Sequence, residues 1–112
     1  MNMKVDIFTH PEFEREFRRL GKKYRSLVDD YAQLLTDLEK NPLQGSSLGM
    51  GVRKVRMGIA SKGSGKSGGV RVITYSIIHK APDVVELTLL YIYDKSEMES
   101  ISTRFIKYLL GK

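Results

Sequence analysis

The chain of 112 residues contains 19 Lys and Arg against 13 Asp and Glu, a formal net charge of +6, and its length predicts a single domain over residues 1–112. Its 41% hydrophobic and 29% charged residues are typical of a globular protein and exclude a mostly disordered chain. The absence of cysteine excludes disulfides, thiolate metal sites and cysteine nucleophiles.

The N-terminal residues predict a short strand followed by a helix. Residues 4–8 alternate apolar and polar side chains, which is the pattern of a half-buried strand. A helix start is then indicated by three residues. Thr9 can cap the helix, Pro11 fits its first turn, and Glu12 completes a capping box. Apolar side chains recur at helical spacing after it, and we expect Gly21 to end this helix.

A second helix follows directly. Ser26 and Asp29 are typical of its start, and Asn41 and Pro42 stop it. Its apolar stripe consists of Leu27, Tyr31, Leu34, Leu35 and Leu38. Because both helices present one apolar face, we expect a helical hairpin that covers one face of a sheet.

Three strand-like segments rich in Val, Ile, Thr and Tyr lie in the second half of the chain, at residues 52–60, 70–79 and 84–93. A Gly/Ser loop at residues 45–51 precedes them, and we expect residues 79–83 to form a hairpin loop. Short connections between consecutive strands predict an antiparallel meander.

The C-terminal residues predict one more helix, with Ser96 and Glu99 at its start. Its apolar stripe consists of Met98, Ile101, Phe105 and Leu109. The predicted fold class is therefore α+β, with an N-terminal helical hairpin packed on a small, mainly antiparallel sheet and a C-terminal helix. No apolar run reaches the length of a membrane span, and the N-terminal residues do not resemble a secretory signal, so we expect a cytoplasmic protein.

The excess positive charge is concentrated in the middle of the chain. Residues 40–82 contain no Asp or Glu, whereas the remainder of the chain has a net charge of −2. A region of one sign attracts a polyanion, and a surface that only keeps a protein in solution usually mixes both signs. We therefore favour a surface that binds a polyanion over a solvated face. The basic residues of this region are Lys40, Arg53, Lys54, Arg56, Lys62, Lys66, Arg71 and Lys80.

Residues 60–67 fit a loose phosphate-loop pattern, with Ala60 in place of the leading Gly. A working phosphate loop needs a helix that begins at its Lys. Gly68, Gly69 and a β-branched run follow here instead, so we reject nucleotide binding. We expect residues 61–69 to form a mobile basic flap that follows a phosphate backbone.

Strand alternation predicts where the basic side chains point. On the first meander strand, Lys54 and Arg56 share the face opposite to the apolar residues. If Arg71 on the next strand shares that face, three cations converge near the strand ends. Cations beside aromatic rings are typical of a single-stranded RNA site, although core packing explains each single tyrosine equally well. Alternation also assigns Arg71, Ile73, Tyr75 and Ile77 to one face of the second strand, and Val85, Leu87, Leu89, Tyr91 and Tyr93 to one face of the third.

This pattern contains no visible general base or metal site. His10 and His79 are far apart in the sequence, and His79 would lie roughly 26 Å from Arg71 along an extended strand. Every carboxylate lies outside the basic region.

Four segments together resemble the RelE/HigB toxins of type II toxin–antitoxin modules. They are residues 51–56, the Gly/Lys loop at 61–69, residues 71–75 and residues 90–97. The resemblance covers nearly the whole chain and implies ribosome-dependent cleavage of mRNA without a metal or another cofactor. It also implies a cognate antitoxin, expected to contain a helix-turn-helix, with the ribosome and mRNA as further partners.

The resemblance further implies which residues form the site. Lys54 and Arg56 match basic positions that polarise the nucleophile or hold the phosphate. Arg71 matches the arginine that contacts the scissile phosphate, and Lys95 matches a basic position after the last strand. The predicted catalytic set is Lys54, Arg56, Arg71, Tyr93 and Lys95, and the predicted RNA- or ribosome-binding set is Arg53, Lys62, Lys66 and Tyr75.

The chain departs from the best-known members of this family at two positions. Those members carry an Arg and a Tyr where this chain has Ser96 and Ser102. Lys95 and Tyr93 are the two candidates to replace them, which leaves the acid and the base unassigned. Two other functions stay open: a ParE-like inhibitor of DNA gyrase on the same fold, and a non-catalytic RNA-binding module.

Overall fold

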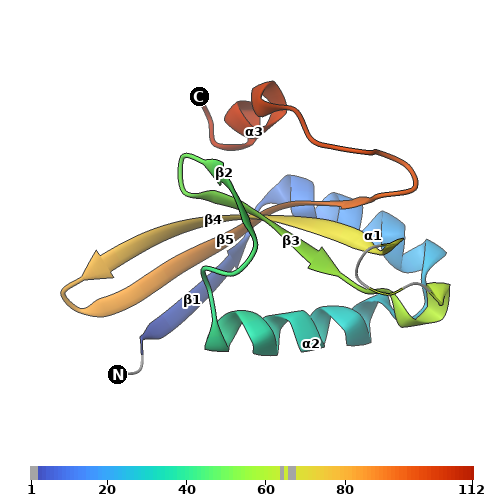
Figure 1. The fold of residues 1–112 in the computed structure, drawn as a ribbon, viewed down its shortest axis with the longest axis horizontal. Helices are drawn as coiled ribbons and strands as arrows, with labels where there is room; N and C mark the ends of the chain where they lie inside the picture. The colour runs from blue at the N-terminus through green and yellow to red at the C-terminus, as the bar shows by residue number, and fades with distance from the viewer. Residues whose placement is uncertain (1–2, 64, 66–67) are drawn as a thin grey trace.

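The computed structural model describes residues 3–63, 65 and 68–112. Within them the chain forms a five-stranded sheet with three α-helices, the α+β architecture that the sequence predicts (Figure 1). No helix among these residues has the length and apolar character that crossing a membrane requires. In chain order the elements are β1 (Lys4–Thr9), α1 (Pro11–Lys23), α2 (Leu27–Lys40), β2 (Ser46–Gly49), β3 (Val52–Met57), the 3₁₀ turn η1 (Ala60–Lys62), β4 (Val70–Lys80), β5 (Asp83–Asp94) and α3 (Thr103–Leu109).

The sheet is mixed, with the strand order β1-β5-β4-β3-β2. β3, β4 and β5 form the predicted antiparallel meander, and β2 extends it on one edge. β1 joins the other edge in parallel with β5, so that Ile7 lies opposite Leu87. A parallel pair needs a long connection, and the two helices with the rest of the meander provide it.

Two apolar clusters lie on opposite faces of the sheet. On one face α1 and α2 pack through buried side chains that include Leu20 and Leu38, which confirms the predicted helical hairpin. On the other face α3 packs over one end of the sheet through Ile106 and Leu109. In Figure 1 α2 lies below the sheet and α3 above it. The helices thus remove both faces at this end of the sheet from water, which is the main source of folding free energy.

The first helix begins and ends differently from the prediction. His10 rather than Thr9 caps α1, because the Nδ1 atom of His10 accepts a hydrogen bond from the Glu12 N–H at 3.0 Å. α1 also continues through Gly21 to Lys23, so the predicted end at Gly21 is wrong. Glycine costs about 1 kcal/mol in a helix, and the buried residues on either side of Gly21 outweigh that cost.

The C-terminal helix begins later than predicted. α3 starts after Ser102, whose Oγ atom accepts a hydrogen bond from the Phe105 N–H at 3.1 Å. Ser96 caps no helix, because both its N–H and its hydroxyl donate to the carboxylate of Asp94. The predicted helix start at Ser96 and Glu99 is therefore wrong, and residues 95–102 form an irregular segment between β5 and α3.

The predicted Gly/Ser loop contains a short edge strand. β2 pairs antiparallel with β3, and the chain enters β2 through Gly45, whose φ is +104°. A Cβ atom on Gly45 would lie 2.6 Å from the carbonyl oxygen of Lys54. Glycine therefore permits both the backbone conformation and the close approach of the two segments.

A β-bulge in β5 changes which side chains share a face. At Ile73 the pairing register between β4 and β5 shifts by one residue, which leaves Leu90 as the extra residue on β5. Leu89 faces the helical hairpin, whereas Tyr91 and Tyr93 face the side of α3. The prediction of one shared face for Val85, Leu87, Leu89, Tyr91 and Tyr93 is therefore wrong.

We expect Gly45→Ala to lower the free energy of unfolding by about 2 kcal/mol or more, because it adds a backbone clash to a strained φ. Gly49→Ala is the matched control, since Gly49 has a φ of +85° and a Cβ atom there would have no neighbour within 4 Å. Urea unfolding followed by circular dichroism measures both variants. Equal losses in the two would contradict a special role for the Gly45 contact.

Candidate anion-binding site

A pocket of about 390 Å³ lies where β3, β4, the start of β2 and the segment after β5 meet. Among the described residues that line it, four side chains are cationic and one is a carboxylate, which is a strong excess of positive charge. The side chains and backbone that line it belong to Gln44, Gly45, Ser46, Lys54, Val55, Arg56, Arg71, Lys95 and Glu99. The four cations Lys54, Arg56, Arg71 and Lys95 are called the pocket cations below.

The register of the sheet places these cations together. Arg56 on β3 lies directly opposite Arg71 on β4, and Lys54 shares the face of Arg56 by strand alternation. Lys95 follows the last residue of β5, and its N–H donates to the carbonyl oxygen of Gly69, just before β4, at 3.3 Å. Backbone pairing therefore brings cations from three adjacent strands to one end of the sheet.

The pocket cations repel one another. Like charges directly opposite each other on neighbouring strands are destabilising, as are further cations close by. Within the described part of the chain, no ion pair neutralises Lys54, Arg56 or Lys95. An anion bound in the pocket would relieve this repulsion, and a phosphate would match both the charge and the donor geometry of the guanidinium groups.

Arg71 is the most enclosed of the pocket cations, with 5% of its surface exposed. An Nη atom of Arg71 donates to the carbonyl oxygen of Val70 at 3.4 Å. Arg56 and Lys95, in contrast, are exposed. The pocket thus combines an arginine held within the sheet with two cations that solvent and a ligand can reach.

Tyr93 lies beside Arg71 on the same face of the sheet and does not line the pocket. It is the β5 partner of Arg71, only 3% of its surface is exposed, and its hydroxyl has no hydrogen-bond partner among the residues that the structure describes. Burial raises the pKa of Tyr93, and the charge of Arg71 opposes that effect in part. The phenol therefore stays protonated at neutral pH.

Three residues of the predicted RNA-binding set, Arg53, Lys62 and Tyr75, do not line the pocket. Arg53 points to the opposite face of β3 and donates to a serine hydroxyl on β4 at 2.9 Å. Lys62, in the 3₁₀ turn that begins the predicted flap, donates to a buried carboxylate at 3.2 Å. Tyr75 packs in the apolar cluster next to α3. Lys66 lies outside the described residues.

The pocket also contains side chains that sequence reasoning missed. Gln44 and Ser46 lie at the entrance to β2, the strand within the predicted loop. Glu99 lies in the irregular segment between β5 and α3. Because the sequence predicts a helix that starts at Ser96, it assigns Glu99 to the first turn of that helix rather than to a site. Ser102 is a second residue of a type that commonly caps a helix, and its position could have indicated that α3 starts after Ser102.

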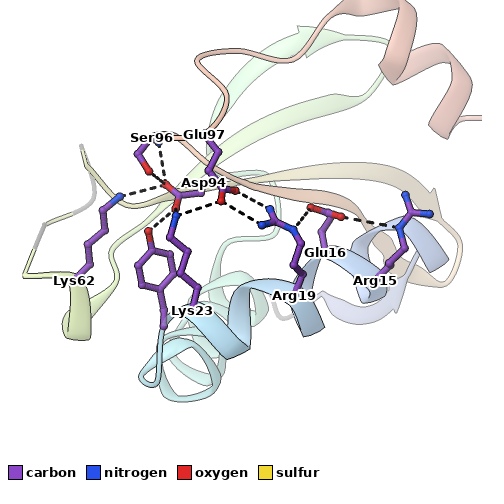
Figure 2. Close-up of polar contacts among 9 residues, drawn as sticks. Arg15, Glu16, Arg19, Lys23, Lys62, Asp94, Ser96 and Glu97 are labelled. Carbon is purple, nitrogen blue, oxygen red and sulfur yellow. Dashed lines mark hydrogen bonds and ion pairs between the residues drawn. The ribbon is translucent and has the colours of Figure 1, made fainter.

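A buried carboxylate fixes the strand end next to the pocket. Asp94, the last residue of β5, is fully buried and accepts a hydrogen bond from the Tyr24 hydroxyl. Figure 2 shows Lys23, Lys62 and Ser96 converging on the same carboxylate, with Nζ–Oδ distances of 2.9 Å for Lys23 and 3.2 Å for Lys62. Asp94 therefore ties the end of α1, the turn η1 and the segment that carries Lys95 to one point.

A second carboxylate extends this network along α1. Glu97 accepts hydrogen bonds from Arg19 at 2.6 Å and from Lys23 at 3.2 Å (Figure 2). These ion pairs hold the first residues of the 95–102 segment against the helix. The path of that segment determines where Lys95 and Glu99 lie.

The hydrogen bonds of this network control the ionisation of its acids. Burial alone would raise the pKa of Asp94, but hydrogen bonds from Tyr24, Ser96 and Lys23 outweigh it and hold the pKa well below the ordinary range. The hydrogen bond from Arg19 likewise lowers the pKa of Glu97. Both acids are therefore ionised in the folded protein at neutral pH.

Comparison with models of known protein families gives no match for this chain. Among the described residues, no group of three or more His, Asp or Glu side chains is arranged to hold a metal ion. The chemistry of the pocket itself is therefore the basis for assigning a function.

We expect Asp94→Asn to lower the free energy of unfolding at neutral pH by about 3 kcal/mol, because Lys23 and Lys62 lose a buried counter-ion. The folded-state pKa of Asp94 is depressed, so its contribution to stability is complete above the ordinary carboxyl pKa of about 4 and is lost as the pH falls below it. The variant should therefore lose less stability than the wild type on acidification.

Urea unfolding at a series of pH values from about 6 down to about 2 measures this difference across the range in which the Asp94 contribution is lost. Asp29→Asn, an exposed acid of α2, is the control and should follow the wild-type curve. Parallel pH curves for Asp94→Asn and the wild type would show that Asp94 does not stabilise the fold through its charge.

Proposed function

We propose that the protein is a RelE/HigB-like toxin of a type II toxin–antitoxin module, and that it cuts mRNA on the ribosome as a metal-independent endoribonuclease. The observation that carries this proposal is the convergence of the pocket cations at one end of the sheet. The α+β fold, with a helical hairpin on one face of the sheet, agrees with the resemblance in the sequence.

The proposed reaction needs cations more than it needs a metal. The ribose 2′-hydroxyl attacks the adjacent phosphate and expels the 5′-oxygen of the next nucleotide. Negative charge grows on the phosphate oxygens and on the leaving oxygen in the transition state. Fixed cations lower the barrier by stabilising that charge, and removing one such group from an enzyme typically costs about 100- to 1000-fold in rate.

The positions of the pocket cations support a division of roles. Arg56 and Arg71, opposite each other across β3 and β4, are assigned to hold the scissile phosphate. Lys54, on the same face of β3, is assigned to the nucleophile side of that phosphate. Because the pocket cations repel one another, binding of a negatively charged phosphate among them is favourable.

Lys95 is the better candidate of the two for the group that protonates the leaving 5′-oxygen. Lys95 is exposed and lines the pocket, and an ammonium carries three N–H donors. Tyr93 carries a proton as well, but its hydroxyl is buried and Tyr93 does not line the pocket. We therefore assign Tyr93 to positioning Arg71 rather than to the chemical step.

The proposal also includes the partners and the location of the protein. A toxin of this class acts on ribosomes in the cytoplasm and is neutralised by a cognate antitoxin, expected to contain a helix-turn-helix. A short adjacent reading frame with that pattern would support the module directly.

We expect a single-stranded RNA oligonucleotide to bind with an affinity that falls as salt rises. A plot of log K, the logarithm of the association constant, against log[KCl] should have a slope of about −3, since each of four pocket cations contributes about −0.7. Lys95→Ala should reduce the slope by about 0.7. Lys80→Ala should leave it unchanged, because Lys80 lies at the other end of β4, about 30 Å from Arg71. Fluorescence anisotropy at several KCl concentrations measures the slopes. The same reduction with Lys80→Ala would mean that RNA binds elsewhere.

We expect Arg56→Ala and Arg71→Ala each to lower mRNA cleavage by at least about 100-fold and to abolish growth arrest on induction. Arg56 is exposed, so its replacement tests the site without disturbing the core. Arg71 is buried, so near-UV circular dichroism must first show that its variant is folded. Sequencing of mRNA ends after induction measures the cleavage.

Lys80 is a cation of β4, like Arg71, but lies outside the pocket. The variant Lys80→Ala is therefore the control and should remain toxic. Full toxicity of both arginine variants would show that the assigned site is wrong. Induction of the DNA-damage response with intact mRNA would instead identify a ParE-like gyrase inhibitor. Salt-dependent RNA binding with neither effect would identify a non-catalytic binding module.

A further inference from the structure

One carboxylate, Glu99, lies among the cations of the pocket. It comes from the irregular 95–102 segment, so it reaches the basic strands from outside the part of the chain that contains no acid. Glu99 is exposed to solvent. The fold therefore adds to the pocket a group of opposite charge that the linear sequence keeps apart from it.

No structural role among the described contacts explains why the side chain of Glu99 lies in the pocket. Within the described residues, Glu99 forms no hydrogen bond or ion pair, although four cations line the same pocket. It does not cap α3 either, because that helix begins at Thr103 with Ser102 as its cap. The neighbouring Glu97, in contrast, is held by Arg19 and Lys23.

Among the described residues that line the pocket, Glu99 is the only one whose side chain is a carboxylate and can act as a base. Guanidinium and ammonium groups carry donors only, so the pocket cations can stabilise charge or give a proton but cannot accept one. An attacking 2′-hydroxyl must lose its proton as the new bond to phosphorus forms. An ionised carboxylate within reach of that hydroxyl is a competent general base.

We propose that Glu99 is the general base of the cleavage reaction and removes the proton from the attacking 2′-hydroxyl, an inference that rests on the proposed function. The 2′-hydroxyl proton moves to a carboxylate oxygen of Glu99 while the 2′-oxygen forms a bond to phosphorus. The bond from phosphorus to the 5′-oxygen breaks, and that oxygen keeps the electron pair and takes a proton from Lys95. The products are a 2′,3′-cyclic phosphate and a 5′-hydroxyl, and proton exchange with water restores Glu99 and Lys95.

The test is a single-turnover cleavage assay with purified protein and ribosomes programmed with mRNA at a codon found by mapping of mRNA ends. Glu99→Gln should lower the rate constant by about 100- to 10,000-fold, the usual contribution of a general base. RNA affinity should be unchanged or higher, because the variant removes a negative charge from the pocket. Glu39→Gln, an exposed acid of α2, is the control and should cleave at the wild-type rate.

A modified substrate separates a base from a merely structural residue. Replacing the bridging 5′-oxygen by sulfur gives a leaving group that departs without a proton. This substrate should restore cleavage by Lys95→Ala, whose missing group acts on the leaving atom. It should not restore cleavage by Glu99→Gln, whose missing group acts on the nucleophile.

The outcomes are distinct. Wild-type or faster cleavage by Glu99→Gln would overturn the assignment while leaving the proposed function intact, and a faster rate would show that Glu99 competes with the phosphate. Rescue of Glu99→Gln by the sulfur substrate would likewise overturn it. If the wild-type protein cuts no mRNA, the proposed function fails and the role of Glu99 fails with it.

Discussion

The buried carboxylate of Asp94 determines how the parts of the pocket are held together. A buried charge is tolerated only where hydrogen bonds and counter-ions satisfy it, so the groups around Asp94 must stay in place for the protein to remain folded. Those groups come from the end of α1, from the turn η1 and from the first residues after β5. Removing this one charge would weaken the attachment of the segment that carries Lys95 and Glu99 to the helical hairpin and leave the ion pairs of Glu97 with Arg19 and Lys23 to hold it.

Some basic residues of the middle of the chain stabilise the fold, and others line the pocket. Lys62 neutralises Asp94 and Arg53 bonds within the sheet, so these cations contribute to structure. The pocket cations repel one another and gain from a bound anion. The pocket therefore contains only part of the basic residues behind the net charge of +6, and those it contains lie at one end of the sheet. In the reaction that we propose, the carboxylate of Glu99 among these cations would accept the proton of the nucleophile.

The sequence predicts the parts of this arrangement that depend on local pattern. Alternation along β3 and β4 is regular, so it places Lys54, Arg56 and Arg71 on one face correctly. It misplaces the tyrosines, because the extra residue Leu90 reverses the alternation within β5 and no local signal marks a bulge. It also misses Glu99, because the path of the 95–102 segment follows from tertiary contacts to α1 that the linear sequence does not reveal.

Analysis of the RNA ends that the purified protein produces is the most direct test of the proposed cleavage, since those ends record which atom attacked the phosphate. We expect a 2′,3′-cyclic phosphate on one fragment and a 5′-hydroxyl on the other, formed in the presence of a chelator and lost when Arg56 is replaced by Ala. Fragments that carry a 3′-hydroxyl and a 5′-phosphate, or programmed ribosomes whose mRNA stays intact, would contradict it.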